Sequence, residues 1–167
     1  MRKIILVLLA VAACKTPTAD AGTPKSQTDS VKTENTKAEA KLLVAIARTA
    51  CFGRCPIYRA ELLDDGTLVF VGERFTAAEG RQQAQLSKER VDSIIARLEQ
   101  SDFAKWKDSY EQRGVTDMPS AILTFRDKTI RHYHGDRSAP EALKSLEDAV
   151  DTLLGIQGWI RQQPVEQ

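Results

Sequence analysis

The sequence predicts an α+β fold: a two-layer sandwich whose antiparallel sheet of four to six strands carries two helices on one face. Short segments of alternating or β-branched residues predict the strands. Two later segments repeat their apolar residues with the period of an α-helix, and each is apolar on one side alone. Because a one-sided helix needs a surface to cover and an antiparallel sheet needs one face covered, we expect the two to pack together.

Strand signals occur before and after the first helical segment. The expected strands are residues 42–50, 57–63, 67–72, 80–87, 120–125 and 129–134. Asp65 and Gly66 predict a tight hairpin between the second and third strands, since glycine supplies the positive φ that such turns require. Residues 126–128 are expected to form a second hairpin.

Each helical segment has a one-sided apolar stripe and start or stop signals. The first stripe is Val91, Ile94, Ile95 and Leu98, with Ser87 as the expected N-cap, and Phe103 and Trp106 are expected to fold back onto the same core. The second stripe is Leu143, Leu146, Val150, Leu153 and Leu154. Ser138 and Glu141 have the spacing of a capping box before it, and Gly155 is expected to end it.

The N-terminus predicts export and a lipid anchor. A basic start is followed by an unbroken apolar run at residues 4–13, which is too short to cross a bilayer and typical of a signal peptide. Small residues before Cys14 resemble the bacterial lipobox, in which cleavage frees the cysteine and its thiol is acylated, for example with palmitate. The alternative is ordinary cleavage after Ala13, which leaves Cys14 as a free thiol. Lipidation is favoured because it accounts for the odd third cysteine.

Three segments are therefore expected: a lipoprotein signal peptide at residues 1–13, a disordered tether at 14–40 and one α+β domain at 41–167. The tether after Cys14 contains no aromatic residue and no Leu, Ile or Met, so it has too little apolar surface to offset the entropy of folding. In lipoproteins of the enteric type, an aspartate directly after the acylated cysteine favours retention in the inner membrane. Residue 15 is a lysine instead, so by analogy the outer membrane is favoured. We expect a periplasmic domain anchored in the bacterial cell envelope.

Charge limits the possible partners. The chain has 24 basic and 23 acidic residues, and loss of Arg2 and Lys3 with the signal peptide leaves 22 basic residues against 23 acidic ones, a net charge of about −1. A near-neutral chain without a basic cluster does not have the electrostatic footprint of a nucleic-acid-binding protein. The expected partners are the membrane, through Cys14, and an unidentified envelope protein or polymer.

Cys51 and Cys55 are expected to form a structural disulfide. A disulfide needs Cα atoms roughly 4.4–6.8 Å apart, whereas four residues of strand would separate them by about 13 Å. The segment must therefore turn, which Gly53 permits, and Pro56 directs Cys55 towards an extended conformation. The oxidising environment of an exported protein favours the bond.

Other uses of the two cysteines remain open. A thiol redox pair usually has the spacing C-x-x-C at the start of a helix, which is one residue shorter than the spacing here. A zinc or copper site would need His132 and His134 to complete a Cys2His2 set, although this spacing is not a familiar zinc-finger pattern. Cys51 and Cys55 could also be two inert thiols.

His132 and His134 lie two residues apart on an expected strand, so they share a face with Ile130 while Tyr133 points to the other. If Ile130 faces the core, the histidines lie at the end of the core and are held by hydrogen bonds, which is the favoured interpretation. If Tyr133 faces the core, the histidines form an exposed pair that could bind a metal or an acidic ligand. Asp117 is either a turn residue, as we favour, or a carboxylate that orients a histidine.

No motif of a known enzyme class is present: there is no G-x-S-x-G, P-loop, H-E-x-x-H or Rossmann glycine string. We therefore expect a non-enzymatic binding or scaffold module with no catalytic residue and no cofactor. The candidate binding surface is Phe52, Arg54, Asp117, His132, Tyr133, His134 and Asp136. A metal-binding or redox protein using Cys51, Cys55, His132 and His134 is the second hypothesis, and a hydrolase using a histidine and Asp117 is the third.

Three motifs resemble those of a family of bacterial envelope domains of unknown function: C-F-G-x-C-P-x-Y, V-T-D-[LM]-P and H-Y-x-G-D. The resemblance covers about residues 44–160 and implies a recurring exported domain, often on a lipoprotein, with no reaction attached. The residues on motif positions are Cys51, Phe52, Gly53, Cys55, Pro56, Tyr58, Gly66, Asp117, Pro119, His132, Tyr133 and Gly135.

Overall fold

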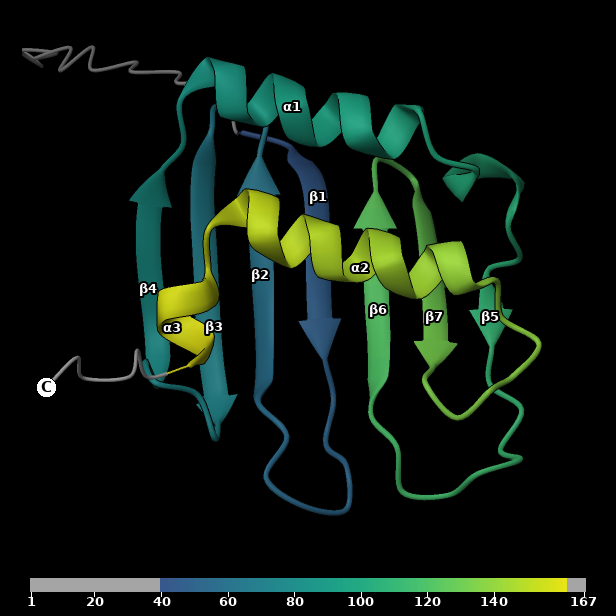
Figure 1. The fold of residues 1–167 in the computed structure, drawn as a ribbon. Helices are drawn as coiled ribbons and strands as arrows, with labels where there is room; N and C mark the ends of the chain where they lie inside the picture. The colour runs from purple at the N-terminus through teal and green to yellow at the C-terminus, as the bar shows by residue number, and fades with distance from the viewer. Residues whose placement is uncertain (1–39, 162–167) are drawn as a thin grey trace, which may run out of the picture. The chain divides into compact units, whose positions relative to one another are not determined.

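The computed structural model describes residues 40–161. The expected signal peptide and tether therefore lie outside the described residues, apart from Ala40. The described chain contains one open sheet of seven strands and three α-helices (Figure 1), which confirms the α+β class. The expected count of four to six strands is wrong, because a short additional strand pairs at one edge of the sheet.

The elements in chain order are β1 (Leu42–Arg48), β2 (Ile57–Leu63), β3 (Thr67–Arg74), β4 (Gly80–Gln85), α1 (Lys88–Glu99), the 3-10 turn η1 (Phe103–Lys105), β5 (Ser109–Tyr110), β6 (Ser120–Phe125), β7 (Lys128–Tyr133), α2 (Glu141–Leu154) and α3 (Gln157–Ile160). The six expected strands and two expected helices occur in the expected order, and β5 and α3 are additional elements. The order of the strands in the sheet is β4-β3-β2-β1-β6-β7-β5.

Strand β1 is central, the fourth of the seven strands, and it pairs on both sides. It lies antiparallel to β2, with Arg48 opposite Tyr58, and antiparallel to β6, with Arg48 opposite Ala121. Strands β1 to β4 form a meander of neighbours, and β7 extends the sheet on the far side of β6. The additional strand β5 is two residues long and is the one strand of this sheet that pairs in parallel, with β7.

Alternate residues of each strand face the helices. In β1 these are Val44, Ile46 and Arg48, and the first two are fully buried. Helices α1 and α2 run across the same face of the sheet (Figure 1), and their apolar stripes join the inward strand residues in one core. The expected fold-back is confirmed: Phe103 is buried in this core and Trp106 packs against it. None of the described helices has the length and apolar composition needed to cross a bilayer.

Two of the three predicted helix-end signals are confirmed. Ser87 caps α1, its side chain accepting a hydrogen bond from the backbone nitrogen of Arg90. Gly155 ends α2 in the left-handed conformation, with φ of 72°. The capping box at Ser138 is wrong: α2 begins after Pro140 without a side-chain cap, because the Ser138 hydroxyl donates to Asp136 Oδ1 at 2.7 Å instead.

Ile94 tests how strongly α1 depends on the shared core. Its side chain is fully buried, whereas Arg97 on the same helix is exposed and has no ion pair in the described part of the chain. We expect Ile94→Ala to lower the free energy of unfolding by about 2–5 kcal/mol, because it removes packed apolar surface and leaves a cavity. Arg97→Ala should change it by less than about 0.5 kcal/mol. Urea unfolding of both variants measures the difference, and equal effects would show that α1 is not part of the core.

Candidate functional site

A buried cluster of charged residues joins the end of β1 to α2. Strand alternation places Arg48 on the inward face after Val44 and Ile46, where its side chain is 11% exposed. Its Nη2 lies 2.8 Å from Asp151 Oδ2 and 3.0 Å from Asp148 Oδ1. Its Nη1 lies 3.4 Å from Glu147 Oε2. One guanidinium therefore connects three carboxylates of the helix to the central strand.

The carboxylates reach Arg48 because two of them lie on the buried stripe of α2. The buried residues of this helix are Leu143, Leu146, Glu147, Val150, Asp151 and Leu154, which follow the i, i+3, i+4 spacing of one helix face. Glu147 and Asp151 are thus in core positions, whereas Asp148 is half-exposed and also accepts from Lys144 Nζ at 2.6 Å. A buried charge is tolerated where it is paired, as these are.

Glu147 also holds both histidines of the chain. His132 Nδ1 lies 2.8 Å from Glu147 Oε1, and His134 Nε2 lies 3.0 Å from Oε2. Their ring centroids are 4.9 Å apart. Arg48 Nη1 is 3.2 Å from His134 Nε2, so the same nitrogen lies beside both the guanidinium and the carboxylate. The histidines are therefore held at the end of the core by a single buried carboxylate.

The pKa values of the two buried carboxyls, Glu147 and Asp151, shift in opposite directions. Burial alone would raise the pKa of Glu147, but hydrogen bonds from His132 and His134 together with the charge of Arg48 lower it below its ordinary value. For Asp151, burial outweighs the influence of Arg48 and raises the pKa of the carboxyl. Its Oδ1 is buried without a hydrogen-bond partner of good geometry among the described residues. Glu147 is therefore the more firmly ionised of the two.

Arg48 and Tyr58 complete the electrostatics of the cluster. Burial alone would lower the pKa of Arg48, but the charge of Asp151 raises it, so the guanidinium stays protonated. Burial raises the pKa of the Tyr58 hydroxyl far above its ordinary value, and the negative charge of Asp151 adds to this effect. Tyr58 is thus a neutral hydroxyl beside the Asp151 carboxyl and not a source of phenolate.

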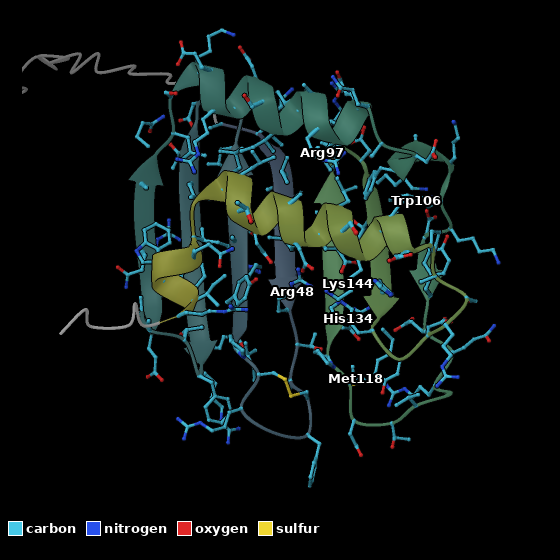
Figure 2. The ribbon with its side chains drawn as sticks, viewed as in Figure 1. Arg48, Arg97, Trp106, Met118, His134 and Lys144 are labelled. Atoms are coloured by element: carbon cyan, nitrogen blue, oxygen red, sulfur yellow. A yellow bond between two sulfur atoms is a disulfide. The ribbon has the colours of Figure 1, made fainter. Side chains whose placement is uncertain are left out.

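A cavity of about 590 Å³ opens beside this cluster. Arg48, Tyr58, His134, Lys144 and Asp151 line it, together with Cys55 of the disulfide loop. Figure 2 shows Arg48, His134 and Lys144 close together below α2. The cluster is therefore accessible from one side, through His134 and Arg48, while His132 and Glu147 lie behind them.

The favoured interpretation of the histidine strand matches the structure. Ile130 and His132 are buried on the inward face, 1% and 4% exposed. Tyr133 lies on the other face but is not an open contact residue, because its hydroxyl donates to Val115 O at 2.8 Å and accepts from Met118 N at 3.0 Å. Asp136 is also buried and structural, since it accepts hydrogen bonds from Ser138 and from the backbone nitrogen of Gln112.

The disulfide between Cys51 and Cys55 is present, with its Cα atoms 5.8 Å apart. A Cys2His2 metal site is therefore wrong, because cysteines joined in a disulfide do not supply thiolate ligands. The bridged loop also lies outside any described helix, so it lacks the helix N-terminus typical of redox pairs. Phe52 is 88% exposed, and Arg54 is exposed with its guanidinium over the Phe75 ring.

Asp117 is exposed and does not orient a histidine. Its carboxylate accepts from Thr116 Oγ1 and contacts neither His132 nor His134 in the described part of the chain. Its backbone has a positive φ of 69°, and its carbonyl accepts from Phe52 N at 3.0 Å. The favoured interpretation of Asp117 as a turn residue agrees with this, and the hydrolase hypothesis loses the contact on which it depended.

Sequence reasoning missed the residues that organise the site: Arg48, Glu147 and Asp151. A signal was present, because Glu147 and Asp151 interrupt an apolar stripe at positions four residues apart. An acidic residue on a buried stripe indicates a buried partner. Nothing local identifies that partner as Arg48, which lies 99 residues before Glu147 and 103 before Asp151.

The lowered pKa of Glu147 predicts how acid acts on the fold. A carboxylate whose pKa falls on folding stabilises the protein above its unfolded-state pKa, and this contribution is lost as the pH falls through the folded-state value. Glu147→Gln should lower the free energy of unfolding by about 3 kcal/mol at pH 7 and reduce the loss of stability below pH 4.5, the ordinary value.

The matched control is Glu141→Gln, an exposed carboxylate on the first turn of the same helix. It should change the stability at pH 7 by less than about 1 kcal/mol. Chemical denaturation of the three proteins between pH 3 and pH 7 makes the comparison. An acid profile of Glu147→Gln that runs parallel to that of the native protein would contradict the account.

Comparison with protein families identifies a domain of unknown function over most of the chain. The family model for the Domain of unknown function (DUF6438) matches residues 42–154, which covers β1 to the end of α2 and includes the whole charged cluster. A search of the curated proteins found no match. The chain belongs to the DUF6438 family, whose domain has no assigned function.

Proposed function

We propose that this protein is a lipid-anchored component of the bacterial cell envelope, held in the outer membrane through Cys14, whose domain is a non-enzymatic module that binds another envelope protein. The contact surface consists of two loops, residues 50–56 and 111–119, which we call the loop surface. The first loop lies between β1 and β2, and the second lies between β5 and β6. The family match supports a recurring domain and assigns no reaction to it.

The observation that carries the proposal is the distribution of exposed apolar side chains. The large hydrophobic residues exposed in the described part of the chain are Leu42, Phe52, Val115 and Met118. Three of these four belong to the loop surface, and Phe52 is 88% exposed. Partly exposed aliphatic residues are common on protein surfaces, whereas an aromatic ring left almost wholly in water, on loops that carry two further exposed apolar residues, indicates a contact site.

The loop surface is held rigid by bonds within and between its two loops. The disulfide closes the first loop, and Phe52 N donates to Asp117 O of the second. The Tyr133 hydroxyl fixes the second loop through Val115 O and Met118 N. A surface that is ordered before binding avoids part of the entropy cost of forming a complex.

The charges of the loops indicate what kind of partner fits. Arg54 and Arg113 are exposed, lie over the rings of Phe75 and Tyr133, and have no ion pair in the described chain. The loops thus combine an exposed aromatic side chain with arginines, the residue types enriched at the centre of protein interfaces. The partner is therefore a protein with an apolar pocket for Phe52 and an acidic rim, in preference to a sugar polymer.

The anchor is tested by Cys14→Ser in the bacterium that produces the protein. Without the thiol no acyl chain can be attached, so the protein should move from the membrane fraction to the soluble fraction. Cys51→Ser keeps Cys14 and should stay in the membrane fraction. Cell fractionation with mass spectrometry of the mature chain measures both, and unchanged membrane association of Cys14→Ser would contradict the anchor.

The loop surface is tested by placing a photo-crosslinking phenylalanine analogue at position 52 and, as a matched control, at position 42. Leu42 is also an exposed apolar residue, 42% exposed, but it lies at the start of β1 and not on the loops. Irradiation of living cells should give a discrete adduct from position 52 that position 42 does not give, and mass spectrometry should identify an envelope protein in it.

Charge reversal on the loops separates specific contact from chance proximity. Arg113→Glu should lower the yield of the position-52 adduct about tenfold, because it places like charges against an acidic rim; a tenfold change corresponds to about 1.4 kcal/mol. Arg97→Glu, on α1, should leave the yield unchanged. Equal adducts from positions 52 and 42, or an adduct insensitive to Arg113→Glu, would overturn the proposal.

A further inference from the structure

The side chains of His132, His134 and Glu147 converge on one small volume. One ligand atom from each, a ring nitrogen from each histidine and a carboxylate oxygen, lie within 4.8 Å of one another. The convergence follows from the fold: His132 on β7 and His134 directly after this strand project to the same face, and that face meets α2 at Glu147. Strand β7 and the next helix along the chain, α2, therefore build one set of donors.

The donor types and spacing suit a transition-metal ion. Imidazole nitrogens and a carboxylate oxygen are ligands of Zn²⁺, Cu²⁺ and Ni²⁺. Zinc lies about 2.0–2.1 Å from such atoms, so tetrahedral ligand atoms are separated by about 3.4 Å. The present separations are 2.8 Å from His132 Nδ1 to Glu147 Oε1 and 3.0 Å from His134 Nε2 to Glu147 Oε2, and the three ligand atoms lie within 4.8 Å of one another. Side-chain rotations that widen the contacts with Glu147 and bring the donors to tetrahedral spacing would admit the ion.

The surroundings provide access and negative charge. His134 lines the cavity of about 590 Å³, so an ion and a further ligand could reach the group from solvent. Around it stand three carboxylates, those of Glu147, Asp148 and Asp151, against the two cations Arg48 and Lys144. Three acidic side chains against two basic ones give this part of the molecule an excess of acidic groups, which favours a bound cation.

Arg48 is the competitor for this position. Its Nη1 is 3.2 Å from His134 Nε2 and 3.4 Å from Glu147 Oε2, so a cationic group already lies beside two of the three donors. Its Nη2 is held separately by Asp148 and Asp151. Nη1 can therefore withdraw towards the cavity while the guanidinium keeps two of its ion pairs.

We propose that His132 Nδ1, His134 Nε2 and the Glu147 carboxylate bind one divalent transition-metal ion, which displaces Arg48 Nη1 from His134. The site goes beyond the proposed partner-binding function and uses different residues. A test of the metal site therefore does not decide the partner-binding proposal. It leaves at least one coordination position open towards the cavity.

The test uses the fact that the chain contains two histidines, both in this site. The full-length chain, prepared without a polyhistidine tag and with ¹⁵N-labelled histidine, is titrated with Zn²⁺ and followed by NMR of the ring nitrogens. One equivalent should shift the signals of both rings. Ring signals that stay unchanged up to several equivalents would overturn the proposal, and this result needs no variant.

Variants locate the ion. His134→Gln should weaken Zn²⁺ binding in calorimetry by at least about tenfold, and so should Glu147→Gln. Glu141→Gln, which alters an exposed carboxylate on the first turn of the same helix, should stay within about threefold of the native protein. Thermal unfolding checks that each variant is folded. Binding that is equally strong in folded His134→Gln and in Glu141→Gln would place the ion elsewhere and overturn the proposal.

Discussion

The ion pairs of Arg48 with the buried carboxylates of α2 are the constraint on which the rest of the structure depends. Bringing a guanidinium to 11% exposure is costly unless its charge is matched, and Asp151 at 2.8 Å and Glu147 at 3.4 Å match it. The pairing fixes the position of α2 along the sheet, because Arg48 is the last residue of the central strand β1. Removing the Arg48 cation would leave the buried carboxylates of Glu147 and Asp151 without its neutralising charge, and they would repel each other.

The same strand that holds these ion pairs also leads into the loop surface of the proposed function. Arg48 ends β1, and the disulfide loop begins two residues after it, so the strand that holds the charged cluster also carries Phe52. Glu147, aligned by Arg48, holds the histidines at the end of β7. The charged cluster, its cavity and the disulfide loop thus share the end of the sheet where β1 finishes, which is also where residues of both the loop and the cluster line the same cavity.

Local sequence patterns predicted the features that neighbouring residues determine. They did not predict contacts between residues that are far apart in the sequence. Six strand segments, both long helices, the cysteine bridge and the face that His132 shares with Ile130 follow from periodicity, turn residues and the alternation of a strand. Alternation alone did not determine whether that face is the inward one. Strand β5 was missed because two residues show no period, and the Ser138 cap failed because Asp136 competes for its hydroxyl. The charged cluster was missed because Arg48 and Asp151 are 103 residues apart, and neither one alone identifies its partner.

A double-mutant cycle on Arg48 and Asp151 tests the central claim most directly. Arg48→Met and Asp151→Asn are made singly and together, and the free energy of unfolding of all four proteins is measured in urea. The account predicts an interaction energy of about 1.5–3 kcal/mol, because the two side chains stabilise the fold mainly through each other. Effects that add to within about 0.5 kcal/mol would contradict it and show that the helix is positioned by apolar packing alone.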